Sequence, residues 1–273
     1  MKPLRYTFKT DILFKMLFVK NPDLLKGLVA ALLGLQLNDI EQFVVHNPEI
    51  PPELIGDKFC RLDINMIVNG QRVDIEVQVE NKGDYRERIL YYGAMDLSTS
   101  LTAGQPYSTL PRTVIISIVD FKLFDCAEYH SHFQLLETTR HTPMTDKLAF
   151  HFFELPKLPA KVGEDDMLLL WLSLFKANTE EDLTKIKALE VPTMNRAIDA
   201  YYTITASTEF QELERLRNKA DHDRAQALYH AKQEAVSRRN VEVAKSLLKI
   251  GLPLDQIAEV SGLTLADIKE LEQ

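Results

Sequence analysis

Two acidic residues, Asp63 and Glu76, are predicted to face each other across a β-hairpin over residues 60–80. The pair Asn69-Gly70 favours a type I′ turn, because both residues tolerate the positive φ angles that this turn requires. With these two residues as the loop, the Cβ atoms of Asp63 and Glu76 would be about 4.5–5.5 Å apart. Two carboxylates at that separation repel each other unless one takes up a proton or a cation binds between them. The spacing therefore indicates metal-ion chemistry.

A divalent cation would resolve the repulsion between the two carboxylates. Mg²⁺ takes oxygen ligands, is often held by only one or two protein carboxylates, and keeps water or substrate phosphate in its other positions. We therefore expect Asp63 and Glu76 to bind Mg²⁺, with Mn²⁺ or Ca²⁺ as alternatives. The competing interpretation is a solvated strand face on which Arg61, Arg72 and Lys82 neutralise the acids.

The opposite face of the same hairpin is apolar. The register set by the turn places Ile64 opposite Ile75 and Met66 opposite Val73. Successive side chains of a strand point to opposite faces of the sheet, so this face is expected to pack against the core.

Helices and further strands are predicted on both sides of the hairpin. Apolar residues recur with helical spacing over residues 8–35, and Pro22 is expected to begin the second of two helices. Residues 41–50 are a candidate strand, and Asp84 or Gly83 can cap a helix after the hairpin. Residues 112–121 form a β-branched run typical of a central strand. The order predicts an α/β (α+β) fold with an αβββαβ core and a mixed sheet.

These motifs resemble the PD-(D/E)XK nuclease superfamily, and within it the Rpn family of recombination-promoting nucleases and related transposases. The resembling stretches are TDILFKMLF at 10–18, Asp63 in the hairpin, IEVQ at 75–78 and RERILYYGAMDLS at 86–98. Together with the C-terminal tail, the resemblance covers nearly the whole chain. It implies a restriction-endonuclease-like fold and hydrolysis of phosphodiester bonds in DNA.

The resemblance also implies roles for individual residues. Asp63 and Glu76 would bind the metal, and the carbonyl of Val77 would be a further ligand. Gln78 would be catalytic at the position where the superfamily usually has lysine, although some branches use glutamine there. An amide can orient water but cannot carry positive charge. Lys82 is a stand-in only if the strand continues regularly through that region.

Two helical pairs are candidates for contacts around this site. Arg88 and Tyr92 are one turn apart and share a helix face, so they are candidates for DNA phosphate contacts. The alternative is an arginine that supports a tyrosine at the edge of the core. Asp11 and Lys15 are also one turn apart. Asp11 is a candidate accessory acid and Lys15 a candidate phosphate contact. The alternative, which we favour, is an ion pair between them within the helix.

We expect three regions along the chain: a PD-(D/E)XK nuclease-like core at 1–155, a helical region and connector at 156–235, and a helix-turn-helix-like segment at 236–273. The second helix of the last segment carries more acids than bases, and DNA phosphates would repel such a surface. We therefore favour packing or self-association for this segment, and a homo-oligomer formed through the C-terminal helical region.

Composition is consistent with a cytoplasmic protein. The chain has 273 residues, 45% of them hydrophobic, which is enough for a full core and a small appended domain. Its start is interrupted by charge, unlike a secretory signal, and no apolar run approaches the length of a membrane span. Cys60 and Cys126 show no paired spacing and are expected to be reduced thiols.

Two functions follow from the sequence. The first is a metal-dependent DNA endonuclease of low sequence specificity, linked to recombination, mobile elements or defence against foreign DNA. The second is a catalytically inactive DNA-binding or regulatory protein in which Gln78 marks lost chemistry. The net charge of −8 weakens DNA affinity, but steering depends on local potential. The pair Asp63 and Glu76 favours the enzyme, because an inactive site has no physical reason to keep two opposed carboxylates.

Overall fold

The computed structural model describes residues 2–46, 64–81 and 83–271. It divides into two compact units, Met1–Glu214 and Arg215–Gln273.

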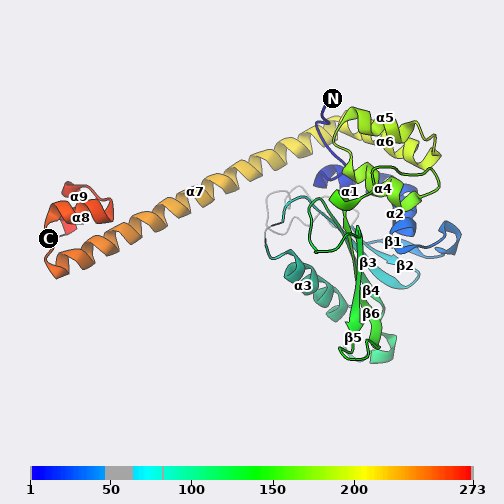
Figure 1. Cartoon of the computed structure of the whole chain (residues 1–273), viewed down its shortest axis with the longest axis horizontal. Coiled ribbons are helices and arrows are strands. Elements are labelled where there is room, and N and C mark those ends of the chain that lie inside the picture. Colours follow the sequence, from blue (N-terminus) through cyan, green and yellow to red (C-terminus); the bar gives the residue numbers. More distant parts are fainter. Residues whose placement is uncertain (1, 47–63, 82, 272–273) are drawn as a thin grey trace. The chain divides into compact units, whose positions relative to one another are not determined.

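The first unit contains a mixed β-sheet, drawn in Figure 1. Within the described residues its six strands are β1 (Phe43–Val45), β2 (Ile64–Val68), β3 (Gln71–Gln78), β4 (Thr113–Val119), β5 (His130–Leu136) and β6 (Pro143–Glu154). They lie in the order β1-β2-β3-β4-β6-β5. The pairs β3·β4 and β4·β6 are parallel and the other neighbours are antiparallel, so the predicted mixed sheet is confirmed.

The hairpin of β2 and β3 has the predicted register throughout its described part. Ile64 pairs with Ile75, and the turn residues Asn69 and Gly70 have φ angles of 49° and 75°. The side chain of Asn69 also accepts hydrogen bonds from the backbone N–H groups of Glu41 and Gln42. These contacts fix the turn against the segment that leads into β1.

Helices cover one face of the sheet and enclose the main core. They are α1 (Asp11–Lys20), α2 (Pro22–Leu33), α4 (Met167–Lys176), α5 (Glu180–Lys187) and α6 (Pro192–Thr205). Short 3₁₀ turns occur at Leu37–Asp39, Tyr107–Thr109 and Leu155–Lys157. Pro22 begins α2 as predicted, because its fixed φ suits the first helical position. Trp171 is fully buried in this core.

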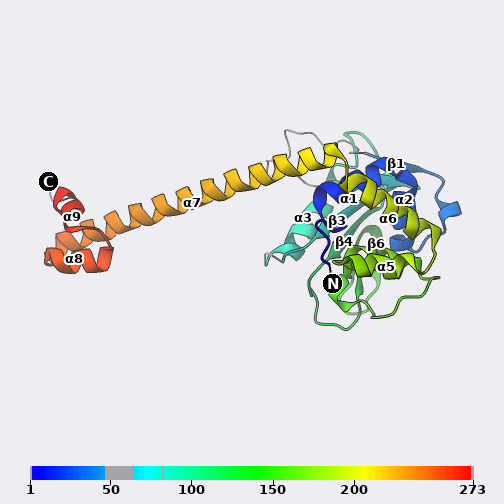
Figure 2. The ribbon, with the colours of Figure 1, turned by 90° about the horizontal axis from the view of Figure 1, so that it is seen from above.

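In the described part of the chain, helix α3 (Tyr85–Ser98) covers the other face of the sheet (Figure 1, Figure 2). Ile89 of α3 packs with Ile115 and Phe150 in a second, smaller core. The helix approaches the sheet closely at Gly93, where a Cβ atom would lie 2.7 Å from a ring carbon of Phe150. Glycine at this position therefore sets how near α3 lies to the strands.

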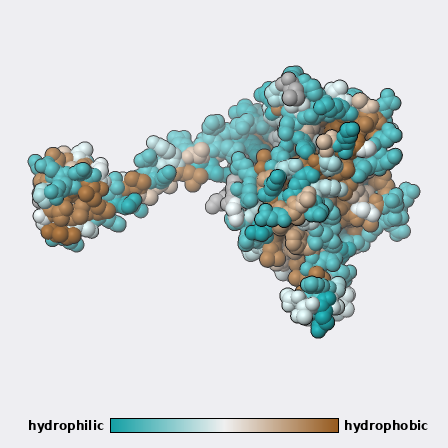
Figure 3. All heavy atoms as spheres, in the orientation of Figure 1, coloured by the Kyte–Doolittle hydropathy of each residue, from teal (hydrophilic) through white to brown (hydrophobic). Residues whose placement is uncertain are grey.

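The second unit is helical. Helix α7 (Thr208–Ile250) begins in the first unit and is followed by α8 (Leu254–Ser261) and α9 (Leu265–Leu271). Ala244, Ile257 and Ile268 form its small core, and Gly262 ends α8 with a φ of 70°. The expected helix-turn-helix shape is therefore present. Figure 3 shows hydrophobic residues on the surface of this unit. Ile250 and Val260 of this unit have exposed side chains.

The described helices include no candidate for a membrane-spanning segment. None of them is both long enough and apolar enough to cross a bilayer.

Candidate functional site

Four polar residues alternate along β3 on the face that α3 covers. We call Arg72, Asp74, Glu76 and Gln78 the β3 polar row. The residues between them point to the other face and pack against the main core. Asp74 and Glu76 are only 7% and 6% exposed. The strand therefore holds two carboxyl groups, two residues apart, almost entirely out of bulk water.

Strand β4 adds a hydroxyl beside this row. Ser117 pairs with Glu76 in the parallel register and lies on the same face of the sheet. Its side chain is fully buried, and its Oγ makes no hydrogen bond within the described part of the chain. Asp74 and Ser117 were not singled out from the sequence. Alternation along β3 was enough to find Asp74, whereas Ser117 depends on a non-local register.

Helix α3 is tied to both ends of the β3 polar row. Near its end, Asp96 receives hydrogen bonds from Arg72 Nε at 3.1 and 3.0 Å, and Arg72 Nη2 contacts the same carboxylate. Hydrogen bonding to Asp96 raises the pKa of Arg72 above its usual value. At the start of the helix, Arg88 Nη2 donates to Gln78 Oε1 at 2.7 Å. These two contacts set the position of the helix along the strand.

The side chain of Gln78 is held at both ends of its amide. Besides the bond from Arg88, Gln78 Nε2 donates to the backbone carbonyl of Glu80 at 2.9 Å. The Arg88 guanidinium also lies over the ring of Tyr85, 4.9 Å from its centroid. The structure thus places Arg88 against Gln78 and Tyr85. Tyr92 lies one turn further along α3 and is half-buried.

Residues just before α1 reach the carboxyl end of β3. The buried Lys9 donates to Asp120 Oδ2 at 2.7 Å and to Asn178 Oδ1 at 3.0 Å. The backbone N–H of Asp120 donates in turn to the carbonyl of Gln78 at 2.9 Å. Asp11 follows in the first turn of α1, and Lys15 is 4% exposed. Such burial is uncommon for lysine, which is almost never fully buried unless it is paired.

The structure describes only some of the predicted site residues. Asp63 and Lys82 lie outside the described residues, so the pairing of Asp63 with Glu76 stays a prediction. Strand β3 ends at Gln78, so the regular strand does not extend to Lys82. The side chain of Val77 packs on the main core, which leaves only its backbone carbonyl as a ligand.

The oxygen donors at the β3 polar row fit a hard divalent cation. Carboxylates of Asp74 and Glu76 and the unbonded hydroxyl of Ser117 are the type of ligand that Mg²⁺, Mn²⁺ and Ca²⁺ prefer. Within residues 2–46, 64–81 and 83–271, no three His, Cys, Asp or Glu side chains already converge on one point. Asp63, which lies outside these ranges, stays the predicted further carboxylate at this row, because the hairpin register would bring it opposite Glu76 if it continued by one residue.

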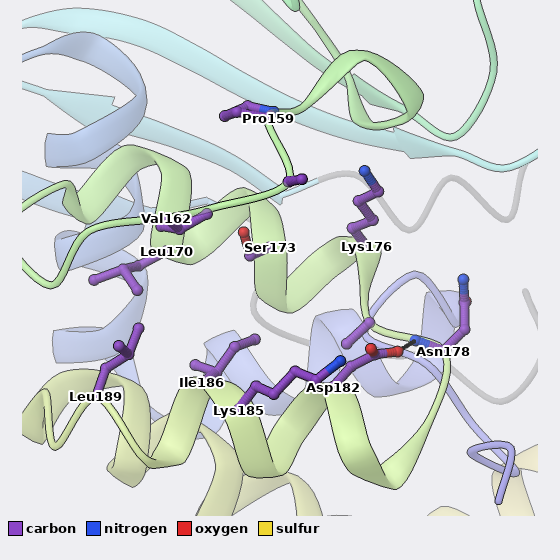
Figure 4. Close-up of a pocket in the computed structure, with 12 residues that line it drawn as sticks. Pro159, Val162, Leu170, Ser173, Lys176, Asn178, Asp182, Lys185, Ile186 and Leu189 are labelled. Atoms are coloured by element: carbon purple, nitrogen blue, oxygen red, sulfur yellow. Dashed lines mark hydrogen bonds between the residues drawn. The ribbon is translucent and has the colours of Figure 1, made fainter. Parts of the chain in front are cut away.

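A separate hollow lies between α4 and α5, shown in Figure 4. It has a volume of about 450 Å³, and its lining includes Lys176, Lys185 and Asp182. Asp182 Oδ2 accepts a hydrogen bond from the backbone N–H of Asn178 at 3.2 Å. None of the predicted site residues lines this hollow, and the helices that form it belong to the main core. It is therefore distinct from the candidate site on β3.

A known family matches most of the chain. The sequence model described as PD-(D/E)XK nuclease family transposase matches residues 8–231. The chain belongs to this family. The matched range includes the whole sheet, α1, α3 and the β3 polar row, and this confirms the resemblance seen in the sequence. No curated protein and no solved structure matches the chain.

Proposed function

We propose that this member of the PD-(D/E)XK nuclease family transposases is a metal-dependent DNA endonuclease of low sequence specificity, associated with recombination, mobile elements or defence against foreign DNA. The observation that carries the proposal is the β3 polar row. Two of its carboxyl groups are buried under α3, within the matched range and beside a glutamine that is held in place. Burying acids is costly, and buried acids that lie together are typical of functional sites.

Asp63, Glu76 and the carbonyl of Val77 are the proposed ligands of the metal, for which Mg²⁺ is the first candidate and Mn²⁺ or Ca²⁺ are alternatives. Asp74 and Ser117 lie close enough along the sheet to join or support this set. When bound, such a cation supplies an activated water and neutralises charge on phosphoryl oxygens.

Side chains around the metal ligands would position the substrate. Gln78 can orient the attacking water through its amide, which the contacts of that amide keep in one place. Tyr92 of α3 and Lys15 of α1 are proposed contacts for DNA phosphates. Asp11 is a proposed accessory acid at the start of α1.

One observation favours a second candidate function, a catalytically inactive protein that binds DNA or regulates other factors. The amide oxygen of Gln78 accepts a hydrogen bond from Arg88, and its nitrogen donates to the carbonyl of Glu80. An amide already engaged at both ends has less capacity to orient water than an unengaged one.

The proposed partner is DNA, and the proposed location is the cytoplasm. We assign self-association, and not DNA binding, to the C-terminal segment. Asp267 of α9 supports this assignment. Its Oδ2 accepts from the backbone N–H of Thr264 at 3.1 Å and from the Thr264 hydroxyl at 2.6 Å. The carboxylate therefore stabilises the start of α9, and its charge would repel phosphates there.

The test is cleavage of supercoiled plasmid by the full chain in Mg²⁺, in Mn²⁺ and in excess chelator. The proposal expects nicking that requires metal and that falls at least about 100-fold in Glu76→Gln, because a lost charged ligand removes several kcal/mol of stabilisation. Asp146→Asn is the matched control, since Asp146 is an exposed acid on β6. An inactive wild-type protein with intact DNA binding would favour the second function.

A further inference from the structure

We propose that Arg88 is a positioning residue that fixes the Gln78 amide and supplies positive charge to the end of the β3 polar row. This inference rests on the proposed nuclease function. Its basis is the contact between the two side chains, in which Arg88 Nη2 donates to Gln78 Oε1 at 2.7 Å.

The position of Arg88 is fixed by its own helix. Asp84 precedes α3, and the backbone N–H of Arg88 donates to the Asp84 carbonyl at 3.0 Å, so Arg88 lies one turn into the helix. Its guanidinium lies 4.9 Å from the centroid of the Tyr85 ring, and Tyr85 is itself buried. A cation held against an aromatic face and hydrogen-bonded to an amide has little freedom to move.

This contact decides which end of the Gln78 amide faces which neighbour. The guanidinium can only donate, so it selects the amide oxygen, and the amide nitrogen then donates to the carbonyl of Glu80. The Glu80 carbonyl can only accept, so it favours the same orientation, and without Arg88 the amide keeps this one contact alone. Arg88 and the Glu80 carbonyl together determine the polarity that Gln78 presents to a bound water or phosphate.

The charge of Arg88 also compensates the acids of the row. Hydrolysis of a phosphodiester bond adds negative charge to the phosphoryl oxygens, which Asp74 and Glu76 would repel. Arg88 places a positive charge in hydrogen-bond contact with the same strand, two residues beyond Glu76. Preorganised positive charge of this kind lowers the activation barrier for hydrolysis more than it strengthens DNA binding, because the negative charge that it stabilises develops in the transition state.

The first experiment detects the contact between Arg88 and Gln78 by NMR and does not depend on cleavage activity. The full chain labelled with ¹⁵N is examined by NMR, and the side-chain amide signals of Gln78 are identified by their loss in Gln78→Ala. Arg88→Met keeps an aliphatic stem over Tyr85 but removes the donor, so we expect the Gln78 amide signals to shift. Arg86→Met is the matched control, since Arg86 is exposed on the same turn of α3. Unchanged Gln78 signals in Arg88→Met would overturn the proposal.

The second experiment separates positioning from DNA binding. In single-turnover cleavage of a labelled duplex, Arg88→Met is expected to lower the rate about 100-fold, as loss of one preorganised donor does. The Kd for DNA in Ca²⁺ is expected to change less than about threefold, because the proposed contact is to Gln78 and not to phosphate. Arg88→Lys is expected to recover part of the rate. A tenfold weaker Kd with an unchanged rate would assign Arg88 to phosphate binding and overturn the proposal.

A double variant tests whether the charge acts through position 78. Gln78→Lys in the Arg88→Met background places a positive charge directly on the strand, and we expect it to restore the rate to within about tenfold of wild type. A double variant as slow as Arg88→Met would overturn the charge role. If the wild-type protein cleaves nothing, the proposed nuclease function fails, while the NMR comparison still decides whether Arg88 positions Gln78.

Discussion

Glu76 of β3 and Ser117 of β4 lie side by side in the parallel register, on the face of the sheet that α3 covers. This relationship gives the candidate site its shape. The carboxylate belongs to the hairpin, and the hydroxyl comes from a strand that follows α3 in the sequence. The chain between them, α3, also brings Arg88 to Gln78. A single β-α-β unit therefore holds Glu76, Gln78, Arg88 and Ser117.

Ser117→Ala is expected to leave the protein as stable as wild type or more stable, by up to about 1 kcal/mol. The hydroxyl is fully buried and makes no hydrogen bond among the described residues, and its removal ends the cost of burying an unsatisfied oxygen. Urea unfolding at pH 7 measures this difference. A loss of stability above about 1 kcal/mol would instead show that the hydroxyl has a partner in the folded protein.

Gly93→Ala is expected to destabilise the first unit by about 1–3 kcal/mol, because the added methyl group would overlap the ring of Phe150. The helix would have to move away from the sheet, so the contact between Arg88 and Gln78 would weaken and cleavage would fall with stability. Gly163→Ala is the matched control, since no atom lies within 4 Å of a Cβ at that position. Equal urea unfolding curves for the two variants would show that α3 does not approach the sheet this closely.

A stack of histidines is expected to make stability depend on pH. His130 on β5 and His151 on β6 share a hydrogen bond of 3.0 Å, and the His132 ring stacks on His151 with centroids 4.2 Å apart. Burial, together with the positive charge of these neighbours and Arg112, lowers the pKa of His151 to about 3. Because this pKa is below that of the unfolded chain, about 6.5, the unfolded state binds the proton first.

The contribution of His151 is therefore complete above pH 6.5 and is lost as the pH falls toward 3. At pH 5 we expect a loss of about 1 kcal/mol relative to pH 7, after allowing for solvent at the partly exposed rings. His151→Phe keeps a stacking ring without the titration, so its unfolding free energy should fall less between pH 7 and pH 5. An identical pH dependence in both proteins would contradict this explanation.

Much of the fold follows from local sequence signals. Asn69-Gly70 predicted the turn, because Asn and Gly tolerate the positive φ angles that a type I′ turn requires. The position of the turn then determined the register of the strands on either side of it. Pro22 likewise predicted the start of α2.

The site was only partly predictable, for a physical reason. Helical spacing showed that Arg88 and Tyr92 share a face, but it could not show that Arg88 bonds to Gln78, since that depends on how α3 docks on the sheet. Ser117 appeared only as part of a β-branched run, because the parallel register of β3 and β4 is set across the intervening helix. Local patterns determine elements, whereas contacts between distant elements determine the site.

The measurement that tests the central claim most directly is plasmid cleavage by Asp63→Asn beside wild type, in Mg²⁺ and in excess chelator. The register predicted from the Asn69-Gly70 turn would bring Asp63 opposite Glu76, so we predict metal-dependent nicking by wild type, a loss of at least about 100-fold in Asp63→Asn, and normal nicking by the Asp146→Asn control. Thermal unfolding confirms that each variant is folded. Cleavage by a folded Asp63→Asn at the wild-type rate would contradict a nuclease site built on this hairpin.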